Sequence, residues 1–209
     1  MKDISLKELL EAGCHFGHQV TRQNPRAREF IFQAREGIHI IDLAKTREGL
    51  LIGAAFIRDV AAKGGIILIV GTKRQAQGIV GEAVAKMRGT GQSDQKPNVF
   101  SVTERWIGGT LTNFEEVHKN YKKFIDLRAR LANEEEKAKY TKKEVGLWEK
   151  ELQKLKKFYG NICDLDKLPD AMFVVDTHKE DLAVKESNKT GVPVVGIVDT
   201  NADPTIVDY

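Results

Sequence analysis

A glycine-led turn after an apolar run is the first place where this sequence could bind a charged ligand. The turn is Gly71-Thr72-Lys73-Arg74, and it lies between the apolar run at 66–70 and a predicted helix. Free backbone N–H groups, the positive end of the helix and two cations suit a phosphate. The turn matches neither GxGxxG nor GxxxxGK(S/T), so a nucleotide is weakly supported. An RNA phosphate is the better prediction for Lys73 and Arg74, and a turn with solvated cations is the alternative.

Cys14, His15 and His18 raise the question of a metal site. His18 lies three residues after His15, but no further Cys or His follows at the spacing of a metal-ligand set. Asp199 and Asp203 follow the last apolar run and could reach His18 only through the fold. A turn with hydrogen-bonded histidines is the preferred interpretation. No metal ligand is assigned, and His18, Asp199 and Asp203 stay weak candidates.

A hydrolase triad can be drawn from His15, Asp176 and a serine, but its context is missing. The sequence has no G-x-S-x-G turn, and neither Ser101 nor Ser187 has the surroundings of a nucleophile. Asp176 follows an apolar run, where α/β enzymes keep catalytic carboxylates, yet capping of the next turn is the preferred role. No catalytic residue is assigned, and the chain is predicted not to be an enzyme.

Basic residues gather in two parts of the chain where they could meet RNA. Arginine donates paired hydrogen bonds to phosphate, and an indole ring can stack on a base. A loop-rich segment with Glu29 as its one acid carries the first group. Lys73 and Arg74 lie in the turn after the apolar run at 66–70, and the others lie just before and along a predicted helical arm. The candidates are Arg22, Arg26, Arg28 and Arg35, then Lys73, Arg74, Arg105 and Trp106, then Lys119, Lys122, Lys123 and Arg130. For the arm lysines, a solvated helix face is an equally good interpretation.

The net charge of +3 is unevenly distributed along the 209 residues. Residues 1–104 carry +4, residues 105–158 carry +5, and residues 159–209 carry −6. A polyanion would be attracted to the first three quarters and repelled by the last. No apolar stretch approaches a membrane span, no signal peptide is evident, and the two cysteines form no CxxC pair. We therefore expect a protein that is cytoplasmic or made inside an organelle, with reduced thiols.

Apolar runs and predicted helices alternate in a way that indicates the fold class. Runs at 66–70, 99–102, 171–175 and 194–198 alternate with predicted helices at 75–87 and 179–189, and a loop is predicted at 89–97. Unbroken apolar strands separated by helices indicate a parallel sheet covered on both faces. Two shorter runs at 30–32 and 38–41 flank a turn at Glu36-Gly37, and a helix is predicted at 43–62. Ser5 with Glu8, and Thr177 with Glu180, are predicted capping boxes.

Residues 111–158 break this pattern and predict an antiparallel helical hairpin. Thr112 with Glu115 and Thr141 with Glu144 are predicted capping boxes, one for each helix. Apolar residues recur at spacings of three and four in each helix, as in a coiled coil, although Arg128 interrupts the first series. The two series are Phe114, Val117, Tyr121, Phe124 and Leu131, then Val145, Trp148, Leu152, Leu155 and Tyr159. The charged segment 133–140 is the predicted tip.

Several stretches in a fixed order resemble the bacterial-type second protein of the small ribosomal subunit. They are residues 12–19, Asn24-Pro25, residues 37–43, residues 70–74, residues 105–113, residues 168–171 and residues 197–204. Together they extend along the whole chain, which makes the resemblance specific. The family usually has a further strand and helix beyond the point where this chain ends, at Tyr209, which raises the question of a longer natural protein.

The resemblance implies a flavodoxin-like three-layer α/β fold with a parallel sheet and an inserted coiled-coil hairpin. It also implies binding to small-subunit ribosomal RNA beside a large mRNA-binding protein of the same subunit. We therefore expect an RNA-binding α/β domain from residues 1–110 and 160–209, with the hairpin at 111–159. The predicted function is a structural constituent of the ribosome in the cytoplasm, with no cofactor. The alternative is a phosphate-ligand-binding α/β enzyme that uses the Gly71-Arg74 turn.

Overall fold

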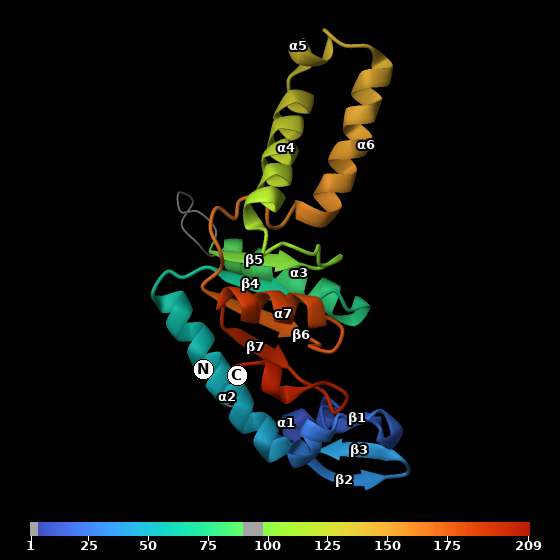
Figure 1. The fold of residues 1–209 in the computed structure, drawn as a ribbon, viewed down its shortest axis with the longest axis vertical. Helices are drawn as coiled ribbons and strands as arrows, with labels where there is room; N and C mark the ends of the chain where they lie inside the picture. The colour runs from blue at the N-terminus through green and yellow to red at the C-terminus, as the bar shows by residue number, and fades with distance from the viewer. Residues whose placement is uncertain (1–3, 90–97) are drawn as a thin grey trace.

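Four of the apolar runs pair into a parallel sheet with the order β5-β4-β6-β7 (Figure 1). The computed structural model describes residues 4–89 and 98–209, so nearly all of the loop predicted at 89–97 lies outside the described residues. The strands are β4 (Ile67–Val70), β5 (Val99–Val102), β6 (Ala171–Val175) and β7 (Val194–Ile197). Ile67 pairs with Val99 on one side and Ala171 on the other, in parallel register. The predicted parallel sheet is confirmed.

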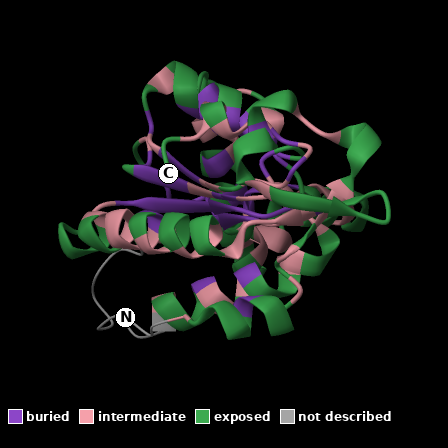
Figure 2. Cartoon of the chain, turned by 90° about the horizontal axis from the view of Figure 1, so that it is seen from below, coloured by how far each residue is buried: buried purple, intermediate pink, exposed green. Residues whose placement is uncertain are grey.

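Helices cover both faces of this sheet, and the buried strands form the middle layer (Figure 2). On one face, α2 (Leu43–Ala62) and α3 (Arg74–Gly89) pack with Ile69 of β4. On the other face, α7 (Asp181–Thr190) packs with Leu68 of the same strand. Successive side chains of a strand point to opposite faces, so an unbroken apolar run serves both layers. The predicted three-layer α/β fold is confirmed.

A second, antiparallel sheet with the order β1-β3-β2 precedes the parallel one. Its strands are β1 (Phe16–Gln19), β2 (Ile31–Arg35) and β3 (Ile38–Ile41). The predicted turn between the last two lies at Glu36 and Gly37, both with positive φ (52° and 77°), which matches the twist of paired strands. β1 was not predicted, because Phe-Gly-His-Gln lacks the β-branched residues that mark strands. Short 3₁₀ turns, Val20–Arg22 and Pro25–Phe30, lead from β1 to β2.

Contacts between residues far apart in the sequence join this small sheet to the loop after β7. The backbone N–H of His18 donates to Thr200 Oγ1 at 2.9 Å, and that of Asn24 donates to the Thr200 carbonyl at 2.9 Å. A Cβ atom on Gly17 would lie only 2.7 Å from Thr200 Cγ2. Glycine therefore allows the close approach of the two sheets at this point.

Two of the predicted helix starts are confirmed near the first sheet, and one elsewhere is wrong. Ser5 and Glu8 form the predicted capping box of α1 (Leu6–Glu11), and α2 has the predicted bounds. The box predicted from Thr177 and Glu180 is absent, because α7 begins after Glu180 with no side-chain cap. Thr177 is fully buried, and the Glu180 carboxylate accepts from Thr72 instead.

The last residues of the chain lie along the outer edge of β7. Tyr209 donates its backbone N–H to the Val194 carbonyl at 3.1 Å, and its own carbonyl accepts from Gly196 at 3.0 Å. That pattern belongs to a parallel pair of strands. The Tyr209 ring also stacks on Phe56 of α2, with ring centres 4.3 Å apart. The edge of β7 is therefore partly covered by residues of the same chain.

The arm comprises α4 (Phe114–Ala132), α5 (Glu134–Lys137) and α6 (Lys142–Tyr159). Figure 1 shows α4 and α6 side by side, projecting from the sheet, with α5 at the far end. Tyr121 packs against Tyr159, and Lys123 pairs with Glu151 further out. Of the two predicted capping boxes, the one from Thr141 to Glu144 is confirmed. The one at Thr112 is wrong, because α4 has no side-chain cap and Thr112 donates to Glu186.

The apolar seam of the arm is continuous with the core of the sheet. Its buried members are Val117, Tyr121, Phe124 and Leu127 of α4, with Leu155 and Tyr159 of α6. They form one cluster with Leu68 and Phe100 of the sheet. Arg128 does not interrupt the seam: its guanidinium lies over the Phe124 ring at 5.7 Å, and Leu127 fills the core position. The base of the seam therefore packs on the sheet as well as between its own two helices, and the coiled-coil geometry stays a prediction.

Two further sequence expectations concern the membrane and the thiols. None of the helices in the part of the chain that the structure describes is long and apolar enough to cross a membrane. Cys14 is exposed and Cys163 is buried, and both are free thiols, as predicted. Burial raises the pKa of the Cys163 thiol, so it stays protonated and behaves as a core side chain.

Candidate RNA-binding surface

The sheet topology brings most of the predicted site residues to one edge. In a parallel sheet the loops after all strands emerge at the carboxyl edge, in the spatial order of the strands. Arg105 follows β5, Lys73 follows β4, Asp176 follows β6 and Asp199 follows β7. The small sheet then continues this edge, because His18 contacts the loop after β7. Along this edge the two basic residues, after β5 and β4, are therefore followed by the two acidic residues, after β6 and β7.

The turn after β4 has its anion-binding groups occupied by carboxylates of the same chain. Lys73 Nζ lies 2.7 Å from Asp176 Oδ2, and both the N–H and the hydroxyl of Thr72 donate to the buried Glu180 carboxylate. Lys179 Nζ donates to the Thr72 carbonyl at 2.8 Å. A phosphate at this turn would have to displace two carboxylates. Of the two predicted phosphate ligands, only Arg74 is exposed with no acidic partner among the described residues.

Asp176 is adapted to this ion pair and to the turn that follows it. Burial alone would raise the pKa of its carboxyl, but hydrogen bonds from Lys73 and the Lys179 N–H, with the charge of Lys73, hold the pKa below its usual range. The residue has a positive φ of 72°, which aspartate tolerates better than most residues. Its second oxygen accepts from the Lys179 N–H at 3.2 Å. The predicted turn-capping role of Asp176 is confirmed.

The arginines of the N-terminal segment divide into one that is bound and three that are exposed. Arg26 Nη1 lies 2.6 Å from Asp203 Oδ2 and 3.0 Å from Thr205 Oγ1, so it links the small sheet to the chain end. Arg35 Nε is 4.0 Å from Oε1 of the neighbouring Glu36, and both side chains are more than two-thirds exposed, so this ion pair is weak. Arg22 and Arg28 are exposed, with no ion pair within the described residues. These two are the freest cations of the group.

The fold does bring His18 to Asp199, while Asp203 lies elsewhere. His18 Nδ1 is 3.0 Å from Asp199 Oδ2, whereas Asp203 binds Arg26 and caps the turn at Pro204–Ile206. Over residues 4–89 and 98–209, no group of three or more His, Cys, Asp or Glu side chains is placed to hold a metal ion. His18 and Asp199 form a polar pair that joins the small sheet to the loop after β7.

Trp106 is buried, so its predicted role as a stacking plane for a base is wrong. Its side chain is 7% exposed, and its indole N–H donates to Glu186 Oε1 at 3.2 Å. Glu186, itself buried, also accepts from the backbone N–H groups of Gly109 at 2.7 Å and Leu111 at 3.0 Å. No sequence pattern indicates this cluster, because Glu186 lies about eighty residues away from its partners. Glu186 positions the loop from which α4 emerges.

Two of the four arm cations predicted on α4 are paired with acids. Lys119 Nζ lies 2.6 Å from Glu116 Oε1, and Lys123 Nζ lies 2.5 Å from Glu151 Oε1 of α6. Lys122 and Arg130 are exposed, with no ion pair among the described residues. Of the predicted RNA-binding residues, those exposed and free of acidic partners within the described chain are Arg22, Arg28, Arg74, Arg105, Lys122 and Arg130.

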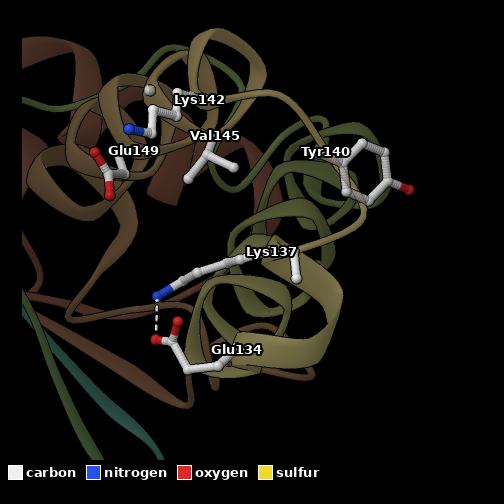
Figure 3. A pocket seen from close by; sticks show the side chains of 8 residues that line it. Glu134, Lys137, Tyr140, Lys142, Val145 and Glu149 are labelled. Carbon is white, nitrogen blue, oxygen red and sulfur yellow. Dashed lines mark hydrogen bonds and ion pairs between the residues drawn. The ribbon is translucent and has the colours of Figure 1, made fainter.

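A shallow hollow at the tip of the arm mixes both charges (Figure 3). Lys137 pairs with Glu134 at 2.8 Å on one side, and Lys142 and Glu149 flank Val145 on the other. Tyr140 lies at its rim and packs edge-on against Trp148, with ring centres 4.6 Å apart. Residues 133–149 carry four lysines against five glutamates, so the tip as a whole has no net positive charge.

The whole arrangement matches a known family. The family model described as ribosomal protein S2 matches residues 9–209, nearly the entire chain. This chain belongs to the ribosomal protein S2 family. Small ribosomal subunit protein uS2 of Roseiflexus castenholzii is 48% identical over 206 residues, which is 99% of this chain and 74% of that protein. The ribosomal protein S2 family is not a family of enzymes, so the alternative of a phosphate-ligand-binding enzyme is not supported.

Two more relatives with the same description have similar identity. Small ribosomal subunit protein uS2 of Desulfovibrio desulfuricans is 46% identical over 209 residues, covering all of this chain and 77% of that protein. Its counterpart in Nitratidesulfovibrio vulgaris is 44% identical over the same length, covering 78% of that protein. The similarity to the ribosomal protein S2 family therefore includes the parallel sheet, the small sheet and the arm alike. The resemblance seen in the sequence motifs is confirmed.

Proposed function

We propose that this chain is a structural constituent of the small ribosomal subunit, where it binds small-subunit ribosomal RNA and supports translation. The ribosome in the cytoplasm would be its place of action, as part of a ribonucleoprotein. Family membership supports the subunit, and one structural observation supports the RNA contact. That observation is the group of exposed cations without acidic partners at the carboxyl edge of the sheet and beside it. A phosphate backbone is the natural counterpart of such a group.

The carboxyl-edge surface is defined here as Arg22, Arg28, Arg74 and Arg105. All four are exposed arginines, which can donate paired hydrogen bonds to phosphate. Lys73 and Arg26 lie among them, but each is already bound to an aspartate, so neither can contact a phosphate without breaking an ion pair. Arg22 and Arg28 are therefore better test residues than Arg26.

Binding to small-subunit ribosomal RNA, measured across a range of salt concentrations, tests the proposal. The double variant Arg22→Glu/Arg28→Glu should bind more weakly, and its log–log salt slope should be shallower by roughly 1.4–1.8 if two phosphate contacts are lost. The control variant Arg58→Glu/Lys63→Glu makes the same charge change on and just after α2. Unchanged affinity and slope in the first variant would remove Arg22 and Arg28 from the surface. Absence of binding by the unmodified protein would overturn the function itself.

Neighbouring proteins of the subunit, including the large mRNA-binding one, are the further partners in this proposal. The family resemblance motivates that particular neighbour. Co-sedimentation of the purified proteins with each other, without RNA, tests the contact. Association only when RNA is added would mean that the RNA bridges them and that no direct interface exists.

A further inference from the structure

The outer face of α6 carries a row of lysines that are not among the predicted RNA-binding residues. They are Lys143, Lys150, Lys154 and Lys157, and all four are exposed. At about 100° per residue these positions fall within roughly 60° of one another around the helix. Leu147 is the remaining residue on this stripe, and it is 57% exposed. The lysine stripe, as we call these four residues, therefore extends along most of the helix.

The contacts of α6 establish which way this stripe points. Leu155 and Tyr159 are buried in the seam, and Trp148 and Leu152 pack partly buried against the same cluster. The stripe lies on the opposite side of the helix, since the seam positions are rotated from it by about half a turn. In Figure 1 no other described element lies along this outer side of α6. The stripe is consequently open to a partner along its length.

Acidic residues distinguish this stripe from the cations of α4. None of the residues on the stripe is acidic, whereas on α4 Lys119 pairs with Glu116 at 2.6 Å and Asp126 lies between Lys122 and Arg130. On α6 the acids are placed at the flanks, and Glu151 faces α4, where it pairs with Lys123. Acids beside lysines weaken the local positive field, so the outer face of α6 has the stronger one.

The stripe also leads back to the carboxyl-edge surface. Lys157, at the base of α6, lies 3.7 Å from Glu104, whose neighbour in the sequence is Arg105. Both members of that ion pair are largely exposed, so it is weak and can yield to a phosphate. From Lys143 to Lys157 the stripe is about 21 Å long at 1.5 Å per residue. Successive lysines in its lower half are roughly 4.5–6 Å apart along the axis, a spacing suited to several phosphates of one RNA segment.

We infer that the arm contacts RNA through the lysine stripe of α6, which continues the carboxyl-edge surface, and not through the predicted cations of α4. The ligand is the phosphodiester backbone of ribosomal RNA, because lysine ammonium groups without base-reading partners recognise charge and not sequence. This inference rests on the proposed function. It assigns the RNA-facing side of the arm to one helix.

Matched quadruple variants test the inference in the full chain. One is Lys143→Gln/Lys150→Gln/Lys154→Gln/Lys157→Gln, and the control is Lys119→Gln/Lys122→Gln/Lys123→Gln/Arg130→Gln. Each removes four positive charges, and glutamine keeps a good helix propensity. In salt titrations with small-subunit ribosomal RNA, the α6 variant should lose roughly 0.7–0.9 of slope for each contact removed, and the α4 variant much less. Circular dichroism should show equal helix content in both, and Lys150→Gln/Lys154→Gln replaces the quadruple variant if it fails to fold.

The outcomes separate this inference from the proposed function. Equal losses in the two variants, or a larger loss in the α4 variant, would overturn the lysine stripe while leaving RNA binding intact. An α6 variant with the unmodified salt slope but poor association with the subunit would mean that an acidic protein occupies the stripe, and would also overturn it. Failure of the unmodified protein to bind the RNA would overturn the proposed function first.

Discussion

Glu186 shows how one buried carboxylate can organise a connection between two parts of a molecule. It accepts the Trp106 indole N–H and the backbone N–H groups of Gly109, Leu111 and Thr112. Burying a charge is costly unless hydrogen bonds satisfy it, and here the donors all come from the loop before α4. The orientation of the arm therefore depends on a residue of α7.

Replacing Glu186 should destabilise the protein more than any surface acid would. Glu186→Gln presents an NH₂ group to donors that need an acceptor, so we expect the free energy of unfolding to fall by about 2–4 kcal/mol. Urea denaturation measures the change. Glu149→Gln, on the exposed surface of the arm, should stay within about 0.5 kcal/mol of the unmodified protein. A Glu186 variant as stable as that control would show that the carboxylate is not needed to hold the loop.

The ion pair between Lys73 and Asp176 should make stability depend on pH. The pKa of Asp176 is lowered in the folded protein, so its contribution is present above the unfolded pKa of about 3.9 and is lost as the pH falls through the folded value. Asp176→Asn tolerates the positive φ and should cost on the order of 1–2 kcal/mol at pH 7. The difference from the unmodified protein should shrink below pH 4 in urea titrations. Asp59→Asn, on the surface of α2, is the control, and a gap that is constant with pH would contradict this origin.

At the scale of elements, the sequence patterns predicted a helix, a strand or a cap correctly only where residues close together in the sequence determine it. The helix at 43–62 and the strands after it were predicted because their apolar patterns are local. The caps predicted at Thr112 and Thr177 failed, since tertiary partners bind or bury those residues. For the same reason Trp106 was misjudged: its burial depends on Glu186, which no spacing rule connects to it. The ion pairs of Arg26 with Asp203 and of Lys73 with Asp176 could not be predicted, because each joins residues more than 100 apart in the sequence.

The structure changes the predicted boundary between the arm and the sheet domain. Residues 111–159 are predicted to form an inserted hairpin, but Val117, Tyr121 and Phe124 at its base belong to the cluster that includes the sheet. Removing 114–156 should therefore prevent cooperative folding, because it exposes that cluster. Removing only 129–146, with a short Gly/Ser bridge, should leave the cluster intact and preserve the thermal midpoint to within a few degrees. Thermal unfolding of both deletions decides the matter, and a well-folded 114–156 deletion would restore the original boundary.

At the scale of the whole molecule, the charge along the sequence is a poor map of the charge in space. The last quarter carries −6, yet its Asp176 pairs with Lys73 and its Asp203 with Arg26, because β6 and β7 lie beside β4 and the small sheet. Acids from the end of the chain therefore lie within the basic edge. They leave fewer cations of this edge available to RNA.

Crosslinking to RNA in the assembled subunit should follow this spatial arrangement. We expect crosslinks at the carboxyl-edge surface and along α6, and few in residues 160–209, which carry a net charge of −6. Mass spectrometry of crosslinked peptides locates them, and the same protein irradiated with free ribosomal RNA controls for non-specific contacts. A dense group of crosslinks on α7 would contradict the orientation.

The docking of the small sheet onto the loop after β7 has a consequence for the order of events during synthesis. His18 and Thr200 are 182 residues apart, and Arg26 and Asp203 are 177 apart. At roughly 5–20 residues per second, a nascent chain needs on the order of ten seconds or more to add that length. Throughout this time β1 to β3 lack their docking partner. The first sheet to be made is thus among the last to reach its final place.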